Sequence, residues 1–259
     1  MKRASQTQWQ NSIFRKQRYK IIHMTYKTFA ELAESRFSAR DFFDTPISKD
    51  ILDSILKTAS KSPSWSNTRP YALAIAQGER KNRIVKSYLE KCDAMLKSKD
   101  KSLSEYERKA LEEQSSPDGD VPVMQPYPDD LKQRSAELGL SLYAHLGIDR
   151  HDFAARNAHM KRNFEAFGAP VIGFVFARSD FMPFSAMDAG LMLQTLFLAA
   201  KSEGVDSCPL GVLANWRSPL DAEYDIPKNY ELLTGFALGY ASDSPVNKFR
   251  AKHPDIELL

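Results

Sequence analysis

The sequence has little of what marks secreted, membrane or nucleic-acid-binding proteins. Only two cysteines, Cys92 and Cys208, occur in 259 residues, which is too few for a disulfide framework and fits a reducing compartment. No uncharged run approaches the ~18 residues of a membrane-spanning helix. The net charge of +3 is too small to indicate a nucleic-acid partner by itself. We therefore expect a cytoplasmic globular protein that binds neither membrane nor nucleic acid, with a chain long enough for a sizeable core.

Acidic residues are missing altogether from residues 1–24, where the basic side chains are Lys2, Arg3, Arg15, Lys16, Arg18 and Lys20. This segment lacks the apolar core of a secretory signal peptide. We expect residues 1–27 to form a basic N-terminal extension, either a tail or an ordered arm. A single domain would follow over residues 28–259.

Apolar periodicity predicts alternating helices and strands in that domain. The expected helices are 28–34, 51–61, 82–99, 131–146, 152–167 and 186–203, and the expected strands are 71–76, 171–176 and 232–240. Ser185 and Asp188 have the spacing of a capping box at the start of helix 186–203. That helix is apolar nearly all round, which predicts burial in a core or a subunit interface. The least regular part is residues 97–130, which contain charge runs and several prolines. We expect a surface excursion there, either a lid or a disordered insertion.

Residues 62–71, Ser-Pro-Ser-Trp-Ser-Asn-Thr-Arg-Pro-Tyr, are the most distinctive stretch. Pro63 and Pro70 stop a helix and stiffen a turn. The stretch presents hydroxyls, an amide and a cation from a stiff frame, which suits a flat polar ligand better than a spacer. The local pattern also fits an ordinary polar loop between a helix and a strand.

A second candidate site is cationic. Arg36, Ser38 and Arg40 alternate along the chain, so an extended backbone would point all three side chains the same way. Two guanidinium groups with a hydroxyl between them form an anion site, most naturally for phosphate. Lys248 and Arg250 repeat this spacing near the other end of the chain, and either set alone also fits a solvated basic patch.

Taken together and in this order, these segments resemble the FMN-dependent nitroreductase family over residues 28–252. Five segments carry the resemblance: Arg36-x-Ser38-x-Arg40-x-Phe42, the 62–71 stretch, Asp188-x-Gly190-x-x-x-Gln194, Pro209-Leu210-Gly211, and Gly239-Tyr240 leading to Lys248-x-Arg250. Residues 137–148 and 162–170 are similar to the nitrobenzoate-reductase-like subgroup. The sequence departs from the family pattern at Phe37, Arg69 and Tyr71, where the family commonly has a polar residue, Gln and Trp.

The resemblance implies an α+β fold, with a central, mostly antiparallel sheet flanked by helices, in an intertwined homodimer with two FMN molecules at its interface. The implied cofactor contacts are Arg36, Phe37, Ser38, Arg40, Pro63, Ser64, Trp65, Asn67, Gln194, Pro209, Leu210, Gly211, Lys248 and Arg250. Pro63 and Ser64 would reach the flavin from the partner subunit. The substrate-binding candidates are Trp65, Arg69, Tyr127 and Phe153.

The activity that the resemblance implies is a ping-pong reaction, in which hydride passes from NADPH or NADH through flavin N5 to a nitroaromatic or a quinone. The flavin would carry the chemistry, so no catalytic acid–base pair is required of the protein. The same fold also supports reductive dehalogenation, dehydrogenation and flavin breakdown, and these alternatives stay open.

Other classes have less support. The histidines and aspartates between residues 145 and 159 match no metal-ligand signature, so we expect no metal. A hydrolase would need a motif such as G-x-S-x-G, which is missing. A nucleic-acid binder that uses the basic extension is the remaining non-enzymatic alternative.

Overall fold

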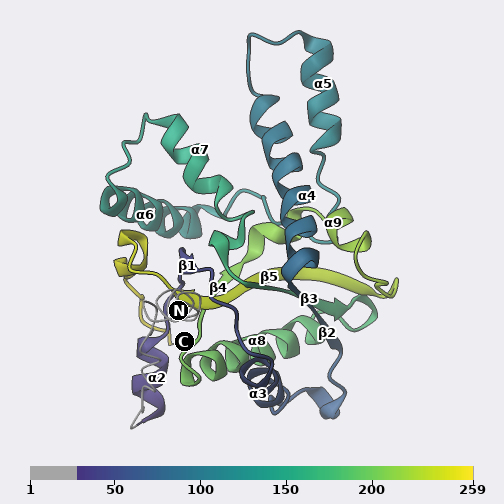
Figure 1. The fold of residues 1–259 in the computed structure, drawn as a ribbon, viewed down its shortest axis with the longest axis vertical. Coiled ribbons are helices and arrows are strands. Elements are labelled where there is room, and N and C mark those ends of the chain that lie inside the picture. Colours follow the sequence, from purple (N-terminus) through teal and green to yellow (C-terminus); the bar gives the residue numbers. More distant parts are fainter. Residues whose placement is uncertain (1–27, 259) are drawn as a thin grey trace, which may run out of the picture.

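The computed structural model describes residues 28–258, so the expectations for the basic extension lie outside the described residues. Its centre is a five-stranded sheet in which every pair of named strands is antiparallel (Figure 1). The longest strand, β5 (Tyr230–Ala241), pairs with β3 (Val171–Arg178), β4 (Asp206–Leu210) and β1 (Phe42–Phe43), while β2 (Tyr71–Gln77) pairs with β3. The predicted strands and the predicted α+β class are confirmed.

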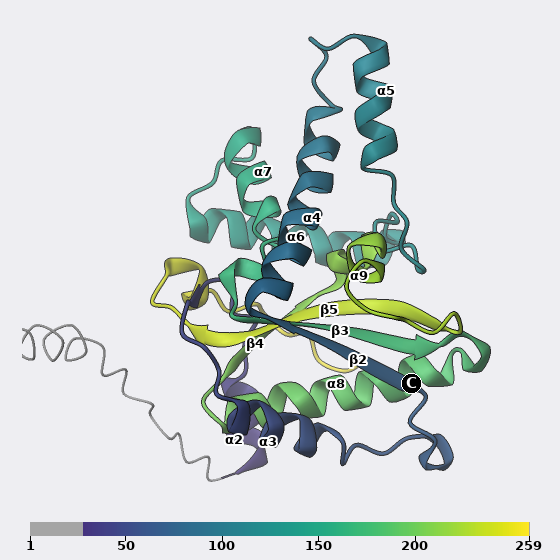
Figure 2. The ribbon, with the colours of Figure 1, turned by 45° about the vertical axis from the view of Figure 1, so that its right-hand side comes forward.

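Helices cover both faces of the sheet (Figures 1 and 2). One face carries α3 (Lys49–Ala59) and α8 (Phe184–Ser202), and the other carries α4 (Gly78–Lys97) and α9 (Ser218–Asp221). Successive side chains of a strand face opposite sides, so β3 contributes to two cores. Val171 and Val175 pack with α3 and α8, whereas Ile172, Phe174 and Phe176 pack with α4. The continuous apolar run of β3 follows from its place between two helical layers.

Several helix ends agree with the sequence. Thr28 caps α2 (Phe29–Ser35), and the Ser48 hydroxyl accepts a hydrogen bond from Ile51 N at 3.3 Å to begin α3. Helix α6 spans Asp129–Leu146 as expected. The prediction for helix 152–167 was too long, because α7 (Phe153–Lys161) ends six residues earlier. Beyond it the short 3₁₀ turn η2 (Ala166–Gly168) has positive φ at Phe167, whose side chain is buried in the core.

The predicted capping box at the start of α8 was wrong. Neither of its side chains caps the helix, which already begins at Phe184. The Ser185 hydroxyl instead donates to the Arg178 carbonyl oxygen at 2.7 Å. The buried Asp188 carboxylate accepts from Trp65 N at 3.0 and 3.2 Å. Tertiary partners thus use the groups that local spacing had assigned to the helix end.

The excursion over residues 97–130 is more regular than expected. Helix α5 (Glu105–Gln114) folds back along α4, and the pair projects from the body of the molecule (Figures 1 and 2). Ser104 and Glu107 form a reciprocal capping box that begins α5. Residues 115–121, here called the strap, then return to the sheet, where Gly119 N donates to the Asn215 carbonyl oxygen at 3.1 Å. A disordered insertion therefore does not describe residues 105–121. Across residues 28–258, no helix is both long and apolar enough to span a membrane.

Candidate functional site

Two segments that are far apart in the sequence, 36–40 and 245–250, meet beside β4 and carry a cluster of cationic residues. Residues 36–40 run next to this strand, with Ser38 bridged to Ser207 and Ala39 N donating to the Ser207 carbonyl oxygen at 3.0 Å. The turn η5 (Pro245–Lys248) brings the C-terminal segment to the same place. Its buried Asn247 joins the segments, because Oδ1 accepts from Arg40 N and Nδ2 donates to the Asp41 carbonyl oxygen, both at 2.7 Å.

Three arginines lie on these two segments, and we call Arg36, Arg40 and Arg250 the cationic clamp. The Arg250 guanidinium lies over the Phe37 ring, 3.9 Å from its centroid, which places it beside the 36–40 segment. None of the three forms an ion pair with a carboxylate within residues 28–258. The nearby Asp41 is already paired with Arg162 at 2.9 Å. Guanidinium groups gathered without carboxylate partners create a site for an anion with several oxygens.

The positive charges of Arg36 and Arg40 also influence the pKa values of neighbouring groups. Burial raises the pKa of the Cys208 thiol to about 11, and the positive charges of Arg40 and Arg36 partly oppose that rise. Burial lowers the pKa of His159 below its usual 6.5, and the charges of Arg40 and Arg162 act in the same direction. Cys208 is therefore an inert thiol near neutral pH. His159 is a neutral imidazole there.

The 62–71 loop has the backbone strain of a functional segment. Ser66, Asn67 and Arg69 all have positive φ, at 49°, 56° and 50°. Such conformations are uncommon for residues other than glycine and gather at functional sites. Asp188 holds Trp65 N, and the Trp65 ring packs on Phe184 with centroids 4.4 Å apart. The loop is thus fixed by the first turns of α8.

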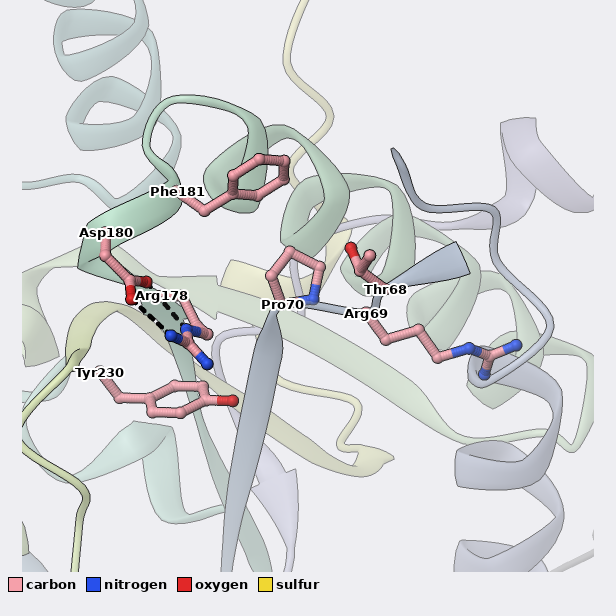
Figure 3. A pocket seen from close by; sticks show the side chains of 7 residues that line it. All are labelled: Thr68, Arg69, Pro70, Arg178, Asp180, Phe181 and Tyr230. Carbon is pink, nitrogen blue, oxygen red and sulfur yellow. Dashed lines mark hydrogen bonds and ion pairs between the residues drawn. The ribbon is translucent and has the colours of Figure 1, made fainter. Parts of the chain in front are cut away.

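Arg69 turns back on its own loop. Its Nε donates to Asn67 Oδ1 at 3.3 Å, and a terminal nitrogen bonds the Ser60 carbonyl oxygen. In Figure 3 its side chain points away from the other residues that line a hollow of about 320 Å³, which are Thr68, Pro70, Arg178, Asp180, Phe181 and Tyr230. Arg178 is engaged as well, since its Nε donates to Asp180 Oδ1 at 2.8 Å.

The other predicted site residues lie at several places on the surface. Pro209 and Gly211 are exposed at the end of β4, but the Leu210 side chain is buried in the core and offers only its backbone. Lys248 is exposed on η5. Gln194 is exposed midway along α8. Tyr127 is exposed just before α6, and Phe153 is exposed at the start of α7. Helix α6 contacts η5 through His145 Nε2, which lies 2.8 Å from the Pro245 carbonyl oxygen.

Within one chain, the loop and the cationic clamp do not meet. Both contact α8, but at opposite ends of the helix: Asp188 binds the loop, and Lys201 lies 5.3 Å from the Phe37 ring centroid. The thirteen residues from Asp188 to Lys201 correspond to about 20 Å of helix. The predicted site residues therefore form two separate groups in one chain.

Sequence reasoning missed Asn247, and it assigned Asp188 to a helix cap instead of to the 62–71 loop. The hydrogen bond from Arg40 N to Asn247 spans 207 residues, and the bond from Trp65 N to Asp188 spans 123. No local spacing signals such a pair. In the part of the chain that the structure describes, no three His, Cys, Asp or Glu side chains gather as metal ligands would.

Comparisons with known proteins agree on one family. A model described as "Nitroreductase family" matches residues 33–240. A "4-nitrobenzoate reductase" of Pseudomonas putida is 31% identical over 228 residues, which are 86% of this chain and 89% of that protein. A "Chloronitrobenzene nitroreductase" of Comamonas testosteroni is 27% identical over 88% of this chain and 93% of that protein. The FMN-dependent nitroreductase NfnB of Mycobacterium smegmatis, solved in complex with NADPH, superposes with a TM-score of 0.74 at 25% identity, covering 87% of this chain and 93% of that one.

Proposed function

The chain belongs to the nitroreductase family, and from this premise we propose that it is an FMN-dependent oxidoreductase that uses NADPH or NADH to reduce nitroaromatic compounds. The relatives support FMN, NADPH and the nitroaromatic acceptor. Similar proteins are named for the reduction of nitrobenzoate, chloronitrobenzene and nitrobenzene. The solved neighbours are described as dependent on FMN and NADPH. We propose quinones as a second class of flat, electron-poor acceptor, reduced in the same ping-pong order that the family resemblance implies.

The cationic clamp is the observation that carries the proposal. FMN ends in a phosphate dianion, and the clamp offers three guanidinium groups that lack carboxylate partners within residues 28–258. Arg36, Arg40 and Arg250 would bind this phosphate, with the Ser38 hydroxyl and the exposed Lys248 beside them. The exposed backbone of Pro209 and Gly211 would lie along the flavin. The residues present thus fit the cofactor.

A second copy of the chain would complete the site. The loop and the clamp are about 20 Å apart along α8, so within one chain they would not contact the same FMN molecule. Between them α8 presents exposed apolar side chains, Met187 and Leu191, which line a hollow of about 630 Å³ with Phe29 and Leu32 of α2. A two-fold axis across this face would place the loop of each protomer at the clamp of the other. We propose that the protein is a homodimer with two such shared sites.

When bound, FMN supplies the redox chemistry by accepting hydride from the nicotinamide nucleotide and passing reducing equivalents to the acceptor. The chain binds and orients the participants. The clamp anchors the phosphate, and the strained loop, held by Asp188, presents Asn67 and Trp65 from a rigid frame. The protein needs no acid–base dyad of its own in this scheme.

The test begins with an absorbance spectrum of the purified protein, followed by anaerobic NADPH and then a nitroaromatic. We expect flavin bands that bleach with NADPH and return on addition of the acceptor. Arg36→Ala and Arg250→Ala should give colourless, less stable protein, whereas full flavin content in both variants would contradict the phosphate assignment. A wild-type protein that stays colourless after incubation with FMN would overturn the proposed function.

A further inference from the structure

The Phe37 ring and the Arg250 guanidinium make a close contact in the cationic clamp. The centre of the guanidinium lies 3.9 Å from the centroid of the ring. This is well within the ~6 Å at which a cation is attracted to an aromatic face. Phe37 lies between Arg36 and Ser38 in the chain, so the contact ties the C-terminal arginine to the segment that carries the rest of the clamp.

The stacked arrangement leaves the hydrogen-bonding edge of Arg250 available. Guanidinium N–H groups lie in the plane of the group, so a ring against the flat face uses none of them. Nη1 already donates to the carbonyl oxygens of Asn247 at 2.7 Å and Phe249 at 2.9 Å. The remaining N–H groups can bind an anion while the ring fixes the plane in which they lie.

Phe37 is itself held in place. Its side chain is half-buried against the core on the α4 side of the sheet. The Lys201 ammonium lies 5.3 Å from its ring centroid and is fixed by Asp206, whose Oδ1 is 2.7 Å from Nζ. Arg250, in contrast, is exposed and lies beyond η5, the last regular element described. Ordering a free arginine side chain costs conformational entropy, so a rigid ring beneath it reduces the free energy that ligand binding must supply.

We propose that Phe37 is a positioning residue, which holds the Arg250 guanidinium ready for the phosphate of FMN instead of contacting the flavin ring through its own side chain. This inference rests on the proposed function and names how the chain adapts a position that is commonly polar in the family. The effect should be specific to the phosphate, because Arg250 would touch no other part of the ligand.

The experiment measures dissociation constants of FMN and riboflavin, which lacks the phosphate, for the apoprotein by flavin fluorescence. Phe37→Leu keeps an apolar side chain but removes the aromatic face, and should weaken FMN binding about 2- to 30-fold. Riboflavin affinity should be unchanged. Phe37→Tyr keeps the face and should bind FMN like the wild type.

A double-mutant cycle with Arg250→Ala separates positioning from general damage. Phe37→Leu should have no further effect on FMN affinity once Arg250 is removed. Equal losses with and without Arg250, or equal losses for FMN and riboflavin, would overturn the role proposed for Phe37 while leaving the proposed function intact. A wild-type protein that binds neither flavin would overturn both.

Discussion

Asp188 shows how a single buried carboxylate holds the backbone of the 62–71 loop. It accepts two contacts from Trp65 N, and it is almost fully buried. Asp188→Ala should leave this N–H unsatisfied and lower the free energy of unfolding by about 1–3 kcal/mol. Urea denaturation measures the loss. Asp188→Asn keeps an oxygen acceptor and is the matched control, and a loss as large in Asn as in Ala would contradict the hydrogen-bond explanation.

His159 makes the stability of the clamp region depend on pH. Burial, with the charges of Arg40 and Arg162, holds the pKa of the folded-state imidazole below the usual 6.5. Above pH 6.5, His159 is mostly neutral in both the folded and the unfolded chain, so its titration does not change the free energy of unfolding there. As pH falls below 6.5, the unfolded chain binds the proton first and folded-state stability is lost.

His159→Gln should therefore reduce the drop in Tm between about pH 7.5 and 5.5. Thermal melts of the apoprotein at several pH values in this window measure the effect. His151→Gln, which changes an exposed histidine on the neighbouring turn, is the control and should follow the wild-type curve. Equal slopes for all three proteins would show that His159 does not titrate differently on folding.

Some site residues were predictable from sequence and others were not, for a physical reason. Arg36, Ser38 and Arg40 share an extended segment, so their spacing alone indicates a common face. Asn247 and Asp188 act through backbone groups that lie 207 and 123 residues away in the chain. Their roles depend on the tertiary fold. Phe37 was assigned to the flavin by resemblance, and its contact with Arg250, which only the structure shows, is the basis for the positioning role proposed above.

At the scale of elements, the strap is the connection most sensitive to a small change. A Cβ added at Gly119 would lie 1.9 Å from the Ala214 carbonyl oxygen. Asp120 Oδ2 in the strap accepts from Leu232 N at 2.7 Å, and Trp216 Nε1 donates to the Ser115 carbonyl oxygen at 3.0 Å. The strap thus fastens the α4–α5 hairpin to the segment that follows Pro209–Gly211.

Gly119→Ala should displace the strap and lower Tm by several degrees, since the backbone of Ala214 and Asn215 blocks the methyl group. Hydrogen exchange should show faster exchange of the Asn215–Arg217 amides. Gly139→Ala is the control, because a Cβ there meets nothing within 4 Å on helix α6, and alanine should stabilise the helix by about 0.5–1 kcal/mol. An unchanged Tm in Gly119→Ala would show that the strap contributes little.

Strands that lie between two helical layers were predictable, and helix α5, which carries no clear apolar stripe, was missed. Strands β2, β3 and β5 carry continuous apolar runs because helices lie on both sides of the sheet. Helix α5 has no buried residue, so its sequence lacks the apolar stripe that marks a helix. Its signal was the capping box of Ser104 and Glu107, which the charge runs around it obscured.

At the scale of the whole molecule, α8 relates the two groups of site residues. The loop contacts its first turns and the cationic clamp lies near its last turn, with an exposed apolar face between them. A symmetric dimer across this face pairs the loop of one protomer with the clamp of the other. Each flavin site would then need both chains. Variants that are defective in different halves of the site could therefore restore one site between them, which is impossible if each site lies within one chain.

Two defective variants should complement each other in a mixed dimer. Arg36→Ala with Arg250→Ala disables the clamp, and Ser64→Ala with Asn67→Ala disables the loop, so each homodimer has two impaired sites. In a mixed dimer one site combines the intact clamp of one chain with the intact loop of the other. Random exchange makes half of the dimers mixed, with one intact site of two, so flavin content should recover to about a quarter of the wild-type value.

We would unfold and refold the variants together, with each refolded alone as controls, and measure bound flavin by absorbance. No recovery, when wild-type protein refolds with its full flavin content, would place each site within a single chain.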